Sequence, residues 1–138
     1  MSARSRYVFM ATALLALAYG LGFVFAPNQI AALYKTDLMN HTGVYNSMLF
    51  GGLLITVALL NWMASQSHDE EVIKLITTAN LVSSGIGLAI TLQRQFVTSS
   101  AFPSAWLNVG IYLVLFCAFL YLRLSMSRTK GWGLPSEL

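Results

Sequence analysis

Charged residues are scarce in this sequence. Asp, Glu, Lys and Arg make up 9% of its 138 residues, whereas soluble domains carry about 25%. Hydrophobic residues make up 57%. A chain of this length forms one domain at most. The composition therefore excludes an ordinary soluble domain and indicates an integral membrane protein, whose first partner is the lipid bilayer. We expect no nucleic-acid partner.

Cysteine is nearly absent too. The single residue, Cys117, excludes an internal disulfide framework and a CxxC redox pair. It also excludes the quinone-linked disulfide enzymes, which need several cysteines. We expect Cys117 to be a buried thiol that only packs in mid-membrane.

Ionisable residues are missing from the interior of the apolar runs. Proton-coupled transporters usually need such a residue inside the membrane, and the small four-helix multidrug exporters depend on a Glu in their first span. The only histidines, His41 and His68, fall in different loops, so they cannot ligate a haem together. No glycine-rich phosphate loop or nucleophile elbow occurs. We therefore expect no catalytic residue and no metal site, no cofactor can be named, and an enzyme is the least favoured class.

What is present is a set of four long apolar runs. Each run is close to the roughly 20 residues that a helix needs to cross a bilayer, and an open strand could not satisfy its backbone in lipid. The sequence predicts an all-α, integral membrane four-helix bundle, with residues 1–138 as a single transmembrane domain and 129–138 as an irregular cytoplasmic tail. The expected spans are about 7–26, 43–64, 72–94 and 104–123.

Two local patterns mark features between the spans. Pro27 opens a segment, residues 27–35, whose apolar side chains share one helical face, which predicts a short interfacial helix. Ser67 followed by Glu70 matches a capping box, with Ser67 as the N-cap of the third span. The acidic stretch from His68 to Glu71 could instead bind a cation, although consecutive acids at a helix start usually serve the helix dipole.

Basic residues predict the orientation. Six of them fall on the side that holds both termini and two on the other, which predicts that both termini are cytoplasmic. The six are Arg4, Arg6, Lys74, Arg123, Arg128 and Lys130, and the two are Lys35 and Arg94. Aromatic residues at the expected boundaries agree: Tyr7, Trp62 and Tyr121 inside, and Tyr34, Tyr45 and Trp106 outside.

A cleaved signal peptide is the competing interpretation of the first span. Arg4 and Arg6 precede an apolar stretch, and Ala16-Leu17-Ala18 matches a cleavage pattern. Against it, the apolar run continues well past Ala18.

Polar residues of the third span recur at spacings of three and four, so they form one stripe on a helix. We expect this stripe to be a helix-packing seam, with a lined cavity as the alternative. Small residues repeat every fourth position in the first and second spans, which suits close packing or other subunits. The stripe is Thr77, Asn80, Ser84, Gly87 and Thr91, ending at Arg94; the small residues are Thr12, Ala16 and Gly20, and Gly43, Ser47 and Gly51.

A second polar set is expected near the outer face. Its candidate ligand-binding residues are Tyr45, Asn46, Arg94 and Asn108, close to Lys35, Asp37 and His41 in the first loop. An arginine with two amides at one depth could bind a carboxylate, a phosphate or a lipid headgroup. In the simpler interpretation the arginine snorkels to the interface and the amides bridge helices. Asn61, beside Trp62, is expected to anchor at the interface.

The order of segments resembles that of small uncharacterised bacterial inner-membrane proteins of the four-helix, DoxX-like kind. The resemblance rests on "FAPNQIAALYK" after the first span and "YNSMLFGGLLITVALLNW" in the second. It implies a four-helix bundle and carries over no functional residue.

Two functional hypotheses remain. The first is a non-enzymatic structural or accessory membrane protein, which packs through its seams against itself or in a larger complex. The alternative is a lipid-, pigment- or small-molecule-binding protein with a site open to the outer face.

Overall fold

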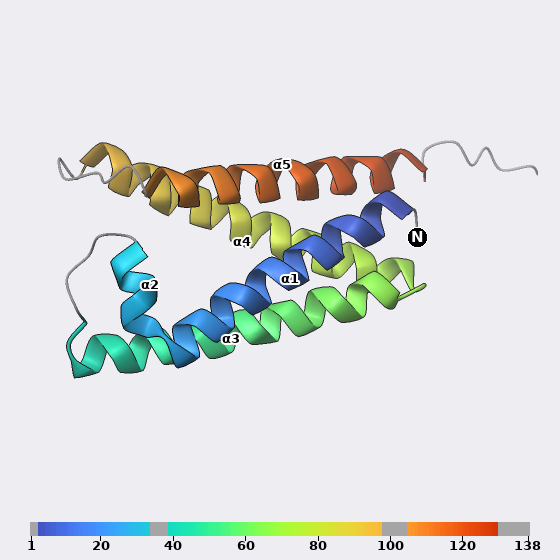
Figure 1. The fold of residues 1–138 in the computed structure, drawn as a ribbon. Helices are drawn as coiled ribbons and strands as arrows, with labels where there is room; N and C mark the ends of the chain where they lie inside the picture. Colours follow the sequence, from blue (N-terminus) through green and yellow to red (C-terminus); the bar gives the residue numbers. More distant parts are fainter. Residues whose placement is uncertain (1–2, 34–38, 98–104, 130–138) are drawn as a thin grey trace, which may run out of the picture.

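The protein consists of helices throughout the part of the chain that the structure, a computed structural model, describes: residues 3–33, 39–97 and 105–129. Four helices are long and one is short (Figure 1). In chain order they are α1 (Ala3–Phe25), α2 (Pro27–Leu33), α3 (His41–Gln66), α4 (Glu70–Val97) and α5 (Ala105–Thr129).

The four long helices are each long and apolar enough to cross a membrane. They have 23, 26, 28 and 25 residues, several more than the predicted spans. The reason is that an apolar run marks only the part within the hydrocarbon, whereas backbone hydrogen bonds continue into the polar flanks. The tail from residue 130 lies outside the described residues.

The short helix α2 begins at Pro27, as predicted, and runs to Leu33. Proline suits the first helical position because its missing N–H would have no partner there. The Asn28 side chain accepts a hydrogen bond of 3.3 Å from the Met39 backbone N–H, which ties α2 to the segment before α3. Asn40 caps α3, because its side chain accepts from the Gly43 N–H at 2.8 Å.

The start of α4 corrects the predicted capping box. Asp69, not Ser67, caps α4: its carboxylate accepts from the Glu71 N–H at 2.9 Å, and its carbonyl accepts the helical bond from Ile73. Ser67 instead ends α3, and its hydroxyl accepts from the Asp69 N–H at 3.1 Å. The connection between α3 and α4 is short. Ser67 therefore makes hydrogen bonds both at the end of α3 and just before α4.

The long helices form two closely packed pairs, α1 with α3 and α4 with α5. In the first pair the backbones meet: a Cβ atom on Gly51 would lie 2.7 Å from the carbonyl oxygen of Gly20, and one on Gly20 would lie 2.9 Å from that of Gly51. In the second pair the ring of Tyr112 lies directly over Gly87, where a Cβ atom would overlap it. A side chain is thus excluded at Gly20 and Gly51 by backbone atoms, and at Gly87 it would displace the Tyr112 ring.

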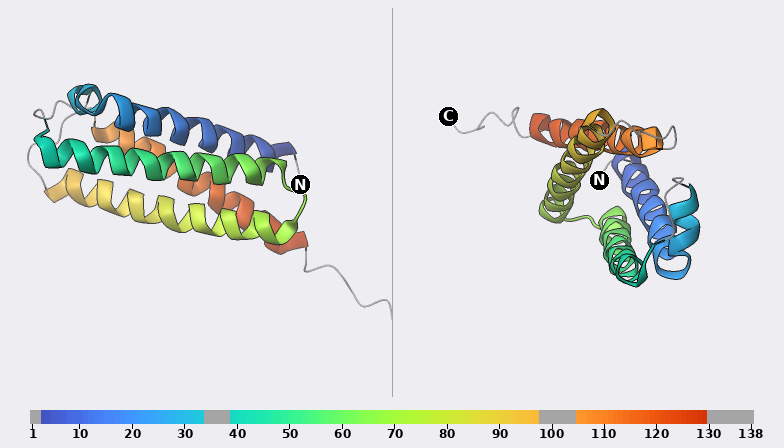
Figure 2. Two further views of the ribbon diagram at one scale, coloured as in Figure 1. Left: turned by 90° about the horizontal axis from the view of Figure 1, so that it is seen from below. Right: turned by 90° about the vertical axis from the view of Figure 1, so that its left-hand side faces the viewer.

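The two pairs touch each other much less, and mainly at one end of the molecule (Figures 1 and 2). This is the end where α1 and α4 begin and α3 and α5 finish. A small core there takes one or two buried side chains from every long helix, including a Phe9–Phe119 ring contact at 5.8 Å. The core consists of Phe9, Ala64, Ile73, Phe119 and Leu122.

Many large apolar side chains face outwards, as lipid contact requires. On α4 these include Leu75, Val82, Ile86 and Ile90. Cys117 corrects a prediction, because it is exposed rather than buried. A residue's distance from the ends of a span says nothing about which side of the helix it occupies.

Candidate functional site

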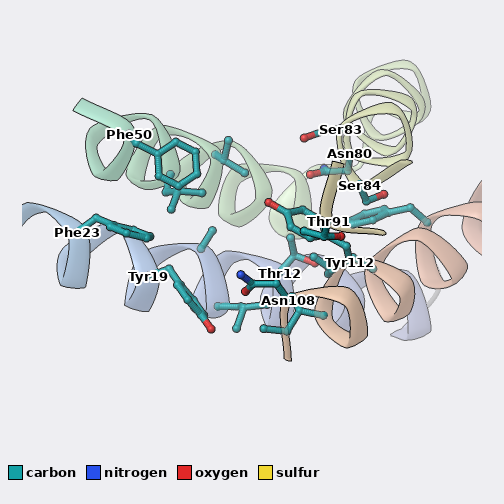
Figure 3. Close-up of a pocket in the computed structure, with 17 residues that line it drawn as sticks. Thr12, Tyr19, Phe23, Phe50, Asn80, Ser83, Ser84, Thr91, Asn108 and Tyr112 are labelled. Carbon is teal, nitrogen blue, oxygen red and sulfur yellow. The ribbon is translucent and has the colours of Figure 1, made fainter. Parts of the chain in front are cut away.

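Between the two helix pairs lies a cavity of about 300 Å³ (Figure 3). All four long helices line it, and its lining is mainly apolar with several polar side chains. The residues are Thr12, Leu15, Ala16, Tyr19 and Phe23 of α1; Phe50, Leu54 and Val57 of α3; Asn80, Ser83, Ser84 and Thr91 of α4; and Asn108, Ile111, Tyr112, Leu115 and Phe119 of α5. Ligand pockets usually fall between about 300 and 1,000 Å³, so this one suits a small ligand.

Helix α4 supplies four of the eight described polar side chains that line the cavity. Asn80, Ser84 and Thr91 follow the periodicity of the predicted stripe and all line the cavity. The hydroxyls of Ser84 and Thr91 donate to carbonyls of their own helix, at 3.1 Å to Leu81 and 2.9 Å to Gly87. These hydroxyls therefore need no partner from elsewhere, and their lone pairs can still accept a hydrogen bond. At 1.5 Å per residue, the polar wall extends about 16 Å along α4.

A pair of amides lies beside the cavity, and one of them, Asn80, lines it. The Asn80 side chain donates to the Asn61 side-chain oxygen at 3.0 Å, and Asn61 donates back at 3.3 Å. Each amide also donates to a carbonyl one turn earlier in its own helix, Ile76 and Val57 respectively, at 2.9 Å. This amide pair (Asn61 and Asn80) joins α3 to α4. It also corrects a prediction, because Asn61 is buried between helices and does not anchor at the interface.

The opposite wall comes from α5. Asn108 and Tyr112 are one turn apart and both line the cavity (Figure 3). The Tyr112 ring reaches α4 because Gly87 presents no side chain at that point. Gly87 therefore acts on the cavity indirectly, by setting the position of a tyrosine that forms its wall.

Aromatic rings form the remaining side, where α1 meets α3. Phe23 of α1 packs edge-to-face on Phe50 of α3 with ring centroids 5.4 Å apart, and Tyr19 lies one turn before Phe23. Such a tilted arrangement is the favoured geometry for aromatic pairs. The cavity thus has an aromatic and aliphatic side and a side of neutral hydrogen-bonding groups.

The structure divides the residues proposed from sequence into two groups. All five stripe residues face the bundle interior: Thr77 is fully buried and bonds its own helix, Gly87 contacts Tyr112, and the other three line the cavity. Of the outer-face set, Asn108 lines the cavity, whereas Tyr45 and Asn46 are exposed and do not. Arg94 belongs to α4, one turn after Thr91, but its side chain lies outside the described part.

Sequence reasoning missed most of the lining as site residues, including Tyr19, Ser83 and Tyr112, and it did not place Asn61 against Asn80. A signal for Asn61 existed, since an amide is costly in lipid unless it is paired. The sequence gave no such signal for Tyr19 and Tyr112, because a tyrosine near a helix end is as typical of the membrane interface as of a binding site.

Among the side chains that the structure describes, no charged one lines the cavity. Within residues 3–33, 39–97 and 105–129, no cluster of His, Cys, Asp and Glu could hold a metal ion. The described lining thus offers shape, apolar contact and neutral hydrogen bonding, and no acid–base pair.

Four apolar spanning helices around such a cavity define a multi-pass membrane protein. Comparison with known families gives a match. A family model described as "Domain of unknown function (DUF8292)" matches residues 10–137, and the chain belongs to this family. No curated protein and no solved structure matches the chain.

Proposed function

We propose that this protein binds a small, uncharged and largely apolar molecule between its two helix pairs. The observation that carries the proposal is the cavity itself, a space of about 300 Å³ reached by side chains of all four long helices. Closely packed membrane helices leave few such spaces, as the Gly20–Gly51 contact within the first pair illustrates. Pockets between the helices of a bundle are common ligand sites.

The lining favours a neutral ligand. A charge moved into an apolar interior costs several kcal/mol unless an opposite charge or a full set of hydrogen bonds compensates it. The described lining of the cavity has amide, hydroxyl and phenol groups but no charged group. An uncharged head with hydrogen-bonding atoms would match the polar wall of α4 and α5, and an apolar body would match Phe23, Phe50 and Leu54.

The test uses two adjacent leucines of α3. Leu54 lines the cavity, whereas Leu53 is 66% exposed on the outer side of the same helix. We expect Leu54→Trp to fill the cavity and Leu53→Trp to leave it open. The probe is 1-octanoylglycerol, a neutral head on a short chain, and its retention on the purified protein is followed by native mass spectrometry.

We expect Leu54→Trp to lower retention about tenfold, equivalent to about 1.4 kcal/mol, and Leu53→Trp to leave it unchanged. Octanoate, the anion with the same chain, should be retained less than the neutral probe by the wild type. Equal retention by both variants would overturn the proposal. Preferred retention of octanoate would contradict the neutral head, and loss of that preference in Arg94→Ala would identify Arg94 as the cause.

An accessory role is the second candidate, and exposed glycines favour it. A Cβ atom on Gly52 of α3 or on Gly110 of α5 would meet no atom within 4 Å. Small residues on the surface of membrane helices are typical of helix–helix contacts. We propose that these surfaces would pack against a second copy or another membrane protein. A monomer after gentle extraction, measured by native mass spectrometry, would count against this role.

We also propose a bacterial inner membrane, the DoxX-like relationship and cytoplasmic termini. The basic residues support the orientation, and the ends of α3 and α5 lie at the same end of the molecule as the start of α1 (Figure 1). A cysteine introduced at Lys74, after Cys117→Ala, should be protected from an impermeant thiol reagent in intact cells. A cysteine introduced at Thr42 should react. The reverse pattern would invert the orientation.

A further inference from the structure

A second hollow adjoins the cavity on the surface between α1 and α5. It is a groove of about 630 Å³. It shares Thr12, Leu15, Ile111 and Leu115 with the cavity, so these four residues separate the two spaces and line both. The other groove residues are Val8, Ala11, Trp106, Leu107, Gly110, Val114 and Ala118.

The groove differs from the cavity in its chemistry. Among its described lining residues, only Thr12 and Trp106 have a polar side-chain atom, and the Thr12 hydroxyl donates to the Val8 carbonyl of its own helix at 2.8 Å. None of these described residues is charged. Hydrocarbon is therefore the material that fits it. Ala11, Gly110 and Ala118 keep it open, because their side chains are small or absent.

We infer that the molecule bound in the cavity is a neutral single-chain amphiphile, whose tail leaves the cavity between α1 and α5 and lies in this groove. The inference rests on the proposed function and extends it to the class of ligand and its route. The two spaces adjoin at the four shared residues, which supports one occupant for both. A cavity of about 300 Å³ is at the lower limit of ligand pockets, so a long chain must extend beyond it.

Because the groove lies on an outward apolar face, such a ligand would enter sideways from the bilayer without crossing water. The shared residues would then act as positioning residues: they set whether a chain can pass, and they form no bond with the head. A short-chain ligand would need the cavity alone, and a long-chain ligand would need both spaces.

Two exposed glycines supply the test. Tryptophan at Gly110 would occupy the groove, whereas tryptophan at Gly52, which lines neither space, is the matched control. Both positions have open space for a side chain. The probes are 1-octanoylglycerol and 1-oleoylglycerol, which share a head, and native mass spectrometry reports their retention and the oligomeric state.

We expect Gly110→Trp to weaken retention of the oleoyl probe about tenfold, or about 1.4 kcal/mol, and to leave the octanoyl probe unchanged. Gly52→Trp should change neither. Undiminished retention of both probes by Gly110→Trp would overturn the inference. The inference would also fail if Gly110→Trp changed only the oligomeric state and not the retention of either probe. If Leu54→Trp also left both probes bound, the proposed function itself would fail.

A measurement on the wild-type protein tests the inference without relying on correct folding of a variant. An oleoylglycerol with a photoreactive diazirine at the tail end should label α1 and α5 at groove residues such as Ala11 and Val114. Excess unlabelled oleoylglycerol should suppress that labelling and leave labelling of the outer faces of α3 and α4 unchanged. Labelling that resists competition everywhere would show ordinary lipid contact and overturn the inference.

Discussion

The contacts within each helix pair and those between the pairs are built differently. Within each pair the helices are in close van der Waals contact. In one pair backbone meets backbone at Gly20 and Gly51, and in the other a ring lies over Gly87. Between the pairs, the described residues close the interface mainly at one end, by the core around Phe9 and Phe119 and by the amide pair. Beyond that end the pairs are separated by the cavity.

The difference shows how one small chain can combine rigidity with a space for a ligand. In a membrane no hydrophobic force drives helices together, so close van der Waals packing and hydrogen bonds must do so. Close packing occurs mainly within the pairs. The polar residues of α4 lie at the weaker interface between the pairs, where they can face either another helix or a ligand.

Breaking the closest contact should have the largest effect. Gly51→Leu places a side chain where even a Cβ atom would lie 2.7 Å from the Gly20 carbonyl oxygen and 2.9 Å from the Val24 nitrogen. Neither backbone atom can move alone, so we expect the α1/α3 pair to separate, at a cost of about 3 kcal/mol or more. Gly52→Leu, one residue away with open space, is the control. Thermal unfolding in detergent measures both, and similar midpoints would refute the close contact.

Breaking the amide pair should have an intermediate effect on stability, and the effect should depend on whether one amide or both are replaced. Asn80→Leu leaves the buried Asn61 amide without its partner, so we expect a loss of about 1–3 kcal/mol. Val82→Leu, on the exposed face of α4, should change little.

The double variant Asn61→Leu/Asn80→Leu sharpens this prediction. Replacing both partners by apolar groups can be nearly neutral, so its stability should recover towards the wild type. Additive losses in the double-mutant cycle would show that the two amides act independently.

The smallest predicted effect concerns two serines of α3. The Ser47 hydroxyl is buried without a hydrogen-bond partner, so Ser47→Ala should raise stability by about 1 kcal/mol. Ser65 is equally buried, but its hydroxyl donates to the Trp62 carbonyl at 2.6 Å. Ser65→Ala should therefore lower stability slightly. Chemical unfolding of both variants under one condition compares them, and a shift in the same direction for both would contradict the assignment.

Sequence periodicity predicted the fold class and the side of α4 that faces inwards. Apolar runs determine helices in lipid, and spacings of three and four place Asn80, Ser84 and Thr91 on one face whatever their partners. Periodicity within one helix cannot say which helix that face meets. The pairing of Asn61 with Asn80, 19 residues apart, depends on the angle between α3 and α4.

The outer-face candidates show a second limit of prediction from the sequence. Tyr45, Asn46 and Asn108 were grouped by depth in the membrane, but depth does not fix rotation about a helix axis. Only Asn108 turns towards the cavity. Asn46 immediately precedes Ser47, which is buried, so a rotation of one residue, about 100°, separates the inward from the outward side.

The unequal lengths of the spanning helices have a consequence for the surrounding bilayer. At 1.5 Å per residue, the 28 residues of α4 extend about 42 Å and the 23 of α1 about 35 Å, against a hydrocarbon thickness of about 30 Å. Helices longer than the membrane tilt to fit it. Because the pairs are joined mainly at one end, tilt would move their free ends apart. A thinner bilayer should therefore widen the cavity, and ligand retention in nanodiscs of short-chain and long-chain lipids would measure that dependence.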